Sequence, residues 1–337
     1  MAEPCRVSAT IDLEADGKRF GVLNVPHSSN ESAWGAVRVP FVVIRNGAGP
    51  TVLLTGGNHG DEYEGPIALT KLARSIEPQQ VAGRVILIPA LNLPAVLAGT
   101  RVSPIDHVNM NRAFPGRWDG TVTLMIADYV TRQILPMCDA VVDLHAGGKT
   151  LSFMPLCGIH VLADATQMAR TEAALLAFGA PISLIIEEFD VAGMLDTAVE
   201  QLGGTFLFTE LGGGGAASAA TVRLAERGIL NVLRHFGVLD GAPEPAATRL
   251  MHSPDPSYFT VSEDRGLFEL LVDLGAEVGP GQPIAQIHDI ERPAKPPAVY
   301  RAERSGLLIG RRWPGLTAPG DCLAVIATDR PGAGARS

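Results

Sequence analysis

Apolar and polar residues alternate along the first 240 positions with two periods, a strand-like one and a helix-like one. Short runs rich in valine, isoleucine and leucine predict buried strands, whereas longer amphipathic stretches predict helices. The predicted strands cover residues 51–55, 84–89, 140–144, 182–186 and 205–211. The predicted helices cover residues 67–75, 121–135, 164–178 and 217–236. This succession indicates an α/β fold with a mostly parallel mixed sheet and helices on both faces.

Residues 6–45 follow a different pattern. They alternate apolar and polar side chains and carry turn signals at Asp16-Gly17 and Asn46-Gly47. We expect short antiparallel strands here, forming an apron at the edge of the main sheet. Together with the strand and helix units, this segment makes up one expected domain, residues 1–240.

The pattern changes after residue 240. Residues 241–256 begin with a Gly- and Pro-rich stretch that predicts a linker, and residues 257–330 predict short strands only. Two stretches resemble each other: Gly266-Leu267 and Ser305-Gly306-Leu307 are each followed by a Pro-Gly turn. We therefore expect a small C-terminal β-domain of barrel-sandwich type, similar to biotinyl and lipoyl domains. No lysine lies between residues 266 and 294, so a carrier role is not expected.

Composition narrows the possible partners and compartment. The chain has 337 residues, 46% of them hydrophobic and 19% charged, which is typical of a globular protein. Its net charge of −9 argues against a nucleic-acid or anionic-membrane partner. No apolar run is long enough for a membrane helix, and the first residues show no signal-peptide pattern. Four scattered cysteines indicate reduced thiols, so we expect a cytoplasmic protein. We also expect a small-molecule substrate, and a homo-oligomer is possible.

One motif carries the strongest chemical signal. His59 and Glu62 follow the predicted strand 51–55 across Gly56-Gly57, so an imidazole and a carboxylate share a short loop. In open α/β sheets, the carboxyl ends of the strands are where ligands bind. A catalytic zinc site needs three protein ligands and one open position, and His145, at the end of the strand 140–144, is the best third candidate. A histidine in that position by itself is more often structural. Together with the His59-x-x-Glu62 pair, a role as metal ligand is the favoured interpretation of His145.

Other polar residues near these strand ends suggest further roles. Glu210 closes the apolar strand 205–211, where a carboxylate is costly to bury unless it is paired or used, so it is a candidate general base. Arg101 can stabilise a developing oxyanion, and Asn111-Arg112 can bind a substrate carboxylate. Asp61 and Asp143 are candidates for orienting the metal ligands, or else a solvated loop acid and a capping acid. Residues 212–217 loosely match a dinucleotide-binding glycine pattern, but no acidic ribose partner follows, so we interpret them as a loop beside Glu210.

Four motifs in this order resemble the succinylglutamate desuccinylase/aspartoacylase family, a branch of the zinc carboxypeptidase fold. They are Gly-Gly-Asn-His59-Gly-Asp-Glu62, Asn111-Arg112-x-Phe-Pro-Gly, Asp-Leu-His145 and Thr-Glu210-Leu-Gly. The resemblance implies one Zn²⁺ per subunit on His59, Glu62 and His145, with Glu210 as general base. It also implies an arginine near the carbonyl, which we place at Arg101, and carboxylate binding by Asn111 and Arg112. Within the family, the long arginine motif and the four-glycine loop resemble deacetylases of N-acetyl-2,4-diaminobutyrate.

Three functions remain open at this stage. The first is a zinc-dependent amidohydrolase that removes a small acyl group from an N-acyl amino acid. The second is a zinc carboxypeptidase acting on peptides, which would release a free amino acid instead of a small acid. The third is a non-catalytic small-molecule-binding module.

Overall fold

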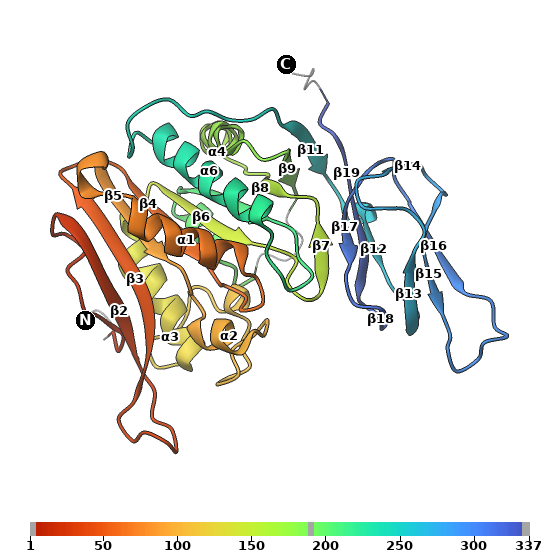
Figure 1. Cartoon of the computed structure of the whole chain (residues 1–337), viewed down its shortest axis with the longest axis horizontal. Helices are drawn as coiled ribbons and strands as arrows, with labels where there is room; N and C mark the ends of the chain where they lie inside the picture. The colour runs from red at the N-terminus through yellow and green to blue at the C-terminus, as the bar shows by residue number, and fades with distance from the viewer. Residues whose placement is uncertain (1–4, 188–191, 332–337) are drawn as a thin grey trace.

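The computed structural model describes residues 5–187 and 192–331, and within them one large mixed sheet dominates the molecule (Figure 1). In spatial order, its first ten strands are β1 (Ser8–Ala9), β2 (Gly17–Pro26), β3 (Ala36–Asn46), β5 (Gly83–Ile88), β4 (Thr51–Gly56), β6 (Ala140–His145), β10 (Thr205–Glu210), β8 (Leu156–His160), β9 (Ile182–Ile186) and β11 (Arg249–Ser253). The helices are α1 (Glu64–Ser75), α2 (Leu93–Ala98), α3 (Val122–Tyr129), α4 (Ala165–Phe178), α5 (Leu195–Gln201) and α6 (Ala219–His235). Shorter helical turns lie at Pro78–Gln80, Met110–Arg112, Val130–Ile134, Leu135–Met137 and Pro256–Tyr258. The predicted α/β class with a mixed sheet is confirmed.

Both faces of this sheet are covered, as the strand pattern predicts. Successive side chains of a strand point to opposite faces. Leu54 therefore packs in the core under α1, α4 and α6, whereas Leu53 packs in the core under α3 and α5. The centre of the sheet is parallel, because β5, β4, β6 and β10 all run in the same direction. Their carboxyl ends consequently lie along one edge.

The predicted elements agree with the structure, with differences at some ends. The strands expected at 51–55, 84–89, 140–144, 182–186 and 205–211 are β4, β5, β6, β9 and β10. The expected N-terminal apron is present as β1, β2 and β3 at the sheet edge, although β2 and β3 form a long hairpin instead of several short strands. The helix expected over 121–135 is α only as far as Tyr129 and then widens into a π turn. Pro136 lacks an N–H and its ring clashes with a regular α-helical turn before it, which favours this change.

The pattern alone missed β7 (Leu151–Phe153), β8, α2 and α5. Each is short, and β8 is interrupted by a glycine. A Cβ atom at Gly158 would lie 2.3 Å from the ring of Phe208 on the neighbouring strand β10. Close packing across strands, which only the folded chain creates, thus explains the glycine that weakens the strand signal.

The C-terminal segment forms two packed antiparallel layers at the far end of the main sheet (Figure 1). One layer contains β16 (Ala298–Arg301), β15 (Pro283–His288), β13 (Gly266–Leu270) and β18 (Leu316–Thr317). The other contains β12 (Phe259–Val261), β19 (Cys322–Asp329), β17 (Gly306–Arg312) and β14 (Glu277–Val278). A separate apolar cluster that includes Ile284, Leu308 and Ile326 fills the space between them. We call these eight strands the C-terminal β-module.

The sequence repeat has a structural counterpart in this module. Gly266 begins β13 and Gly306 begins β17, and a Cβ atom at either glycine would lie 2.2 Å from a carbonyl oxygen of the paired strand. Both positions need glycine for the same reason, because the partner backbone approaches too closely for a side chain.

The segment expected as a linker, residues 241–256, contains strand β11. This strand pairs in parallel with β9 and in antiparallel with β19, so the module continues the main sheet. The Gly- and Pro-rich composition that indicates a linker ends before β11 begins, so the expected linker is correct only for the residues before Arg249. A second junction lies at β7, which pairs with β17. Among the described residues, no helix is long and apolar enough to span a membrane.

Candidate active site

The loop between β4 and α1 brings two of the candidate ligands to the carboxyl edge of the sheet. Its path depends on Gly60, where a Cβ atom would lie 2.0 Å from the backbone of Ala95 in α2. The Gly60 N–H donates to the carbonyl of Thr100 at 3.0 Å. The loop is therefore held against α2 and against the segment that leads to Arg101.

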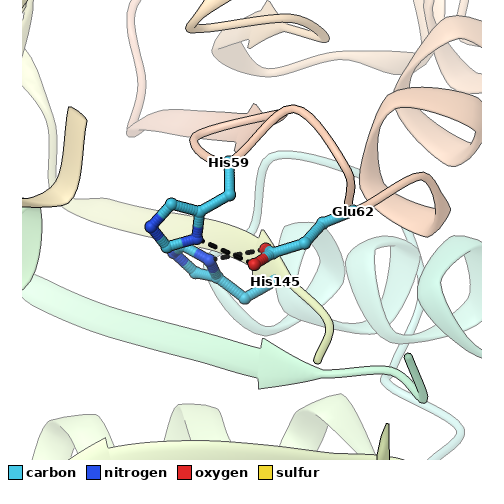
Figure 2. A group of neighbouring side chains, drawn as sticks. All are labelled: His59, Glu62 and His145. Atoms are coloured by element: carbon cyan, nitrogen blue, oxygen red, sulfur yellow. Dashed lines mark hydrogen bonds and ion pairs between the residues drawn. The ribbon is translucent and has the colours of Figure 1, made fainter. Parts of the chain in front are cut away.

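His59, Glu62 and His145 converge at this edge, as Figure 2 shows. One ligand atom from each lies within 4.8 Å of the others, and all three side chains are buried. Glu62 stands between the imidazoles, with Oε1 2.8 Å from Nδ1 of His59 and Oε2 2.9 Å from Nδ1 of His145. His145 joins the loop because β6 pairs in parallel with β4. The expectation that adjacent parallel strands bring these residues together is confirmed.

The far nitrogen of each imidazole faces an oxygen acceptor. Nε2 of His59 lies 3.1 Å from Oδ1 of Asn109, and Nε2 of His145 lies 2.8 Å from Oδ2 of Asp143. A neutral imidazole that donates from Nε2 carries its lone pair on Nδ1. In that tautomer both lone pairs point toward the oxygens of Glu62, an arrangement that a cation bound between them stabilises.

The charges of the site determine which groups it offers to a cation. Burial raises the pKa of Glu62, but the two imidazoles outweigh burial and hold it well below its usual range. Burial lowers the pKa of His145, but Asp143 and Glu62 outweigh it and hold it well above its usual range. The cluster thus offers two imidazole nitrogens and one ionised carboxylate, and its outer hydrogen bonds fix the ring orientations, as in known metal sites. These residues fit a metal ion of the zinc class.

Asp143 has the orienting position that the sequence suggested as one of two possibilities. Besides His145, it accepts hydrogen bonds from Thr55 Oγ1 at 2.7 Å and from Asn58 Nδ2 at 2.8 Å. Asp61 has a different position, because its Oδ2 accepts from the backbone N–H of Lys149 at 2.7 Å. Asp61 therefore fixes the loop after His145 and does not touch the ligands.

Glu210 lies beside this cluster because β10 is the other parallel neighbour of β6. The pairing register places Glu210 opposite His145. Its Oε2 atom is buried and has no hydrogen-bond partner among the described residues. Burial, followed by the charge of Glu62, raises the pKa of Glu210 to about 8. An enclosed carboxyl group with such a pKa can exchange protons near neutral pH.

The loop before α3 supplies the remaining predicted residues. The guanidinium Nη1 of Arg101 lies 3.5 Å from Oε1 of Glu62. Asn111 accepts a hydrogen bond from the backbone N–H of Leu195 at 3.1 Å, which anchors it to the start of α5. Arg101, Asn111 and Arg112 line one cavity together with Glu210 and the candidate metal-ligand cluster of His59, Glu62 and His145. This cavity measures about 240 Å³.

The catalytic-domain model of succinylglutamate desuccinylases and aspartoacylases matches residues 48–236, more than half of the chain. The chain belongs to this family. A relative from Halomonas elongata, N-alpha-acetyl-L-2,4-diaminobutyric acid deacetylase, is 49% identical over 326 residues, which are 96% of this chain and 95% of that protein. The family resemblance read from the four motifs is therefore confirmed.

Solved structures of family members extend over the β-module as well. The product-bound structure of the ectoine utilization protein EutE (DoeB) from Ruegeria pomeroyi has a TM-score of 0.95 and 51% identity, covering 97% of this chain and 99% of that one. A succinylglutamate desuccinylase from Silicibacter sp. TM1040 has a TM-score of 0.92 and 48% identity, covering 97% and 100%. The two-layer C-terminal architecture thus accompanies the family's catalytic domain in these structures.

Several residues of the site carry no strong signal in the sequence. Asn109 and Asn58 are isolated amides whose roles depend on which atoms they face. His160 and Asp196 also line the cavity, and neither belongs to a recognisable motif in the sequence. The strand β8 that carries His160 and the helix α5 that carries Asp196 were both missed. Recognising a histidine at the end of a strand would have required recognising β8 first.

Proposed function

We propose that this protein is a zinc-dependent amidohydrolase that removes the acetyl group from a small N-acetylated amino acid, with N-α-acetyl-L-2,4-diaminobutyrate as its substrate. The observation that carries this proposal is the convergence of His59, Glu62 and His145 with Glu210 in one cavity. The Halomonas elongata relative, which carries the name of that deacetylase, supports the choice of acyl group and amino acid.

His59, Glu62 and His145 would hold the zinc ion through Nδ1, a carboxylate oxygen and Nδ1. Two imidazoles and one carboxylate are a ligand set of catalytic zinc sites, which leave a position for water. A bound zinc ion supplies acidity to water and polarises a carbonyl. Asn109 and Asp143 keep the two rings in the tautomer that this arrangement needs.

Glu210 is the proposed general base. Its carboxylate takes a proton from the water that attacks the acyl carbon, and the protonated group then gives that proton to the leaving amine. This returns Glu210 to its starting state and releases acetate and the free amino acid. The enclosed Oε2 atom and the raised pKa, about 8, support a group that holds and returns a proton at neutral pH.

Three other side chains bind and orient the substrate in this proposal. Arg101 approaches from the Glu62 side, where its fixed positive charge stabilises the negative charge that develops on the carbonyl oxygen. Asn111 and Arg112 hold the α-carboxylate through amide and guanidinium donors. Because Oδ1 of Asn111 already accepts from Leu195, the amide's Nδ2 side is the one available to substrate oxygen.

We also propose that the domains are residues 1–240 and 257–330, and that the second excludes peptides from the first. Leu151 and Phe153 of β7 line the cavity, and β7 pairs with β17 of the β-module. A cavity of about 240 Å³ suits a small acylated amino acid better than a peptide. We place the enzyme in the cytoplasm, where its four cysteines would remain reduced as they are here.

The test measures acetate release from N-α-acetyl-L-2,4-diaminobutyrate by the zinc-loaded protein and by a Glu210→Gln variant. We expect the variant to keep its zinc and its melting temperature while kcat falls by about 10²- to 10⁴-fold, because the proton carrier is lost. The exposed Glu291→Gln variant is the matched control and should retain full turnover.

Chelation of the metal should also abolish acetate release, and added zinc should restore it. Retained turnover in the metal-free protein or in Glu210→Gln would refute the mechanism. Release of a C-terminal amino acid from peptides, without release of acetate, would instead support a carboxypeptidase.

A further inference from the structure

The cavity extends well beyond the metal-ligand cluster. Phe206, Phe208 and Glu210 alternate along β10 and therefore share one face of the sheet. All three line the cavity, and the ring of His160 stacks on Phe208 with centroids 5.4 Å apart. Phe208 precedes Glu210 by two residues, or about 7 Å along the strand. The cavity thus has a reactive end at Glu210 and a second end at His160.

The second end is acidic. Asp196 lines it with only 6% of its surface exposed, and His160 Nδ1 lies 3.0 Å from Oε1 of Glu200. Asp196 also lies close enough to His160 to interact with it electrostatically. Acidic side chains thus outnumber the single histidine at this end. Among residues 5–187 and 192–331, no lysine or arginine forms an ion pair with Asp196.

One oxygen of Asp196 remains available to a ligand. Oδ1 accepts from the backbone N–H and the hydroxyl of Thr197 at 2.5 and 3.1 Å, whereas Oδ2 has no hydrogen bond within the described part of the chain. Burial raises the pKa of Asp196, and the charge of His160 lowers it. A buried carboxylate without a fixed cationic partner is stabilised when a ligand brings a positive charge.

The chain segment that carries Asp196 lies next to the residues proposed to bind the substrate's amino-acid part. Leu195, its neighbour, donates its N–H to Asn111, and Phe114 donates its N–H to the carbonyl of Gly193 at 3.0 Å. The chain segment that carries Asp196 is therefore fastened to the segment that carries Asn111 and Arg112. A group bound by Asp196 lies on the same side of the cavity as the α-carboxylate in the proposed binding mode.

We propose that Asp196 binds the side-chain ammonium of the substrate and thereby makes the enzyme selective for N-acylated diamino acids over neutral ones. This inference rests on the proposed deacylase function. An extended 2,4-diaminobutyrate places its side-chain nitrogen about 5 Å from the amide nitrogen, a span comparable to the step from Glu210 to Phe208. In this binding mode, the ammonium extends from the reactive end toward the second end of the same cavity, which Asp196 lines.

The experiment compares two substrates that differ only in this charge, N-α-acetyl-L-2,4-diaminobutyrate and the nearly isosteric N-acetyl-L-norvaline. For the unaltered enzyme, we expect kcat/KM to favour the charged substrate. In Asp196→Asn, kcat/KM for the charged substrate should fall by about 10- to 100-fold, the value of a charge-assisted hydrogen bond, while that for N-acetyl-L-norvaline stays level or rises. The loss should appear mainly in KM.

Two variants control for structural effects. Asp196→Glu keeps the charge and should preserve part of the preference for the diamino substrate. Asp240→Asn removes an exposed carboxylate elsewhere and should leave kcat/KM unchanged for both substrates. An equal fall for both substrates in Asp196→Asn would show that Asp196 only supports the start of α5 and would overturn the proposal.

The two proposals fail in different ways. If the unaltered, zinc-loaded enzyme releases acetate from both substrates with equal efficiency, the role of Asp196 is refuted and the deacylase function stands. If it releases acetate from neither substrate, the proposed function itself is refuted.

Discussion

At the scale of single residues, the candidate metal-ligand cluster depends on acceptors that face the outer nitrogen of each imidazole. Asp143 is fully buried and touches Thr55, Asn58 and His145. Three donors around one carboxylate offset much of the cost of burying its charge. Asp143 can therefore fix the tautomer of His145 without moving itself.

We expect Asp143→Asn to weaken zinc binding by about 10- to 100-fold, because an amide in place of the carboxylate lowers the basicity of the ring and no longer fixes its tautomer. Competition with a chromophoric chelator measures the affinity. Asp61→Asn is the matched control, since Asp61 is also buried but contacts the backbone of Lys149 instead of His145. Equal losses in both variants would contradict an orienting role for Asp143.

At the scale of elements, the loop before α3 is held in place by Asp106. Its two carboxylate oxygens accept from the backbone N–H and the hydroxyl of Thr123, both at 2.9 Å, in the first turn of α3. The same loop carries Arg101 at one end and Asn111-Arg112 at the other. A helix terminus thus anchors the residues proposed to bind substrate.

Removing this contact should cost about 1 kcal/mol of unfolding free energy at pH 7 in Asp106→Ala, the usual value of a helix cap. Burial raises the pKa of Asp106, but the hydrogen bonds from Thr123, Thr121 and Val108 lower it below its ordinary value of 3.8. A lowered pKa means that the stabilisation is complete above pH 3.8 and is lost as the pH falls through the folded-state pKa.

Urea unfolding of this variant and the unaltered protein at pH 7 and near pH 3 measures the difference. The difference in unfolding free energy between the two proteins should be smaller near pH 3 than at pH 7. Asp119→Ala, an exposed acid on the same loop, should show little change at either pH. A gap that stays constant with pH would mean that the carboxylate charge of Asp106 is not the stabilising feature.

At the scale of the whole molecule, the C-terminal β-module shapes the cavity from outside the family's catalytic domain. β7 supplies Leu151 and Phe153 to the cavity wall, and it pairs with β17. Gly310 of β17 lies opposite Phe153, and a Cβ atom there would be 2.5 Å from the phenylalanine ring. The junction thus sets the position of a wall without contributing a catalytic group.

We expect Gly310→Ala to displace Phe153, destabilising the protein by about 1–3 kcal/mol, because the added methyl group overpacks the junction. KM for the acetylated substrate should rise more than kcat falls, since the catalytic residues lie elsewhere. Gly315→Ala in the same module is the control, because no other heavy atom would lie within 4 Å of its new Cβ. An unchanged KM in a destabilised Gly310→Ala enzyme would show that the β-module does not influence substrate binding.

The sequence by itself determined the features that depend on neighbouring residues. Apolar runs bounded by glycine indicated the central strands, and His59-x-x-Glu62 indicated a candidate metal-binding pair, because such signals extend over only a few positions. His145 and Glu210 could also be placed, since parallel strands end at a common edge. The family followed from the order of the four motifs.

Only the tertiary structure decided which atoms meet. Asn109 and Asp143 become ring acceptors, and His160 and Asp196 become neighbours in the cavity, because strands and helices far apart in sequence pack together. The pairing of β7 with β17 likewise joins segments that no local pattern relates. Such contacts arise from the packing of whole elements, and side-chain orientation is fixed only when that packing is complete.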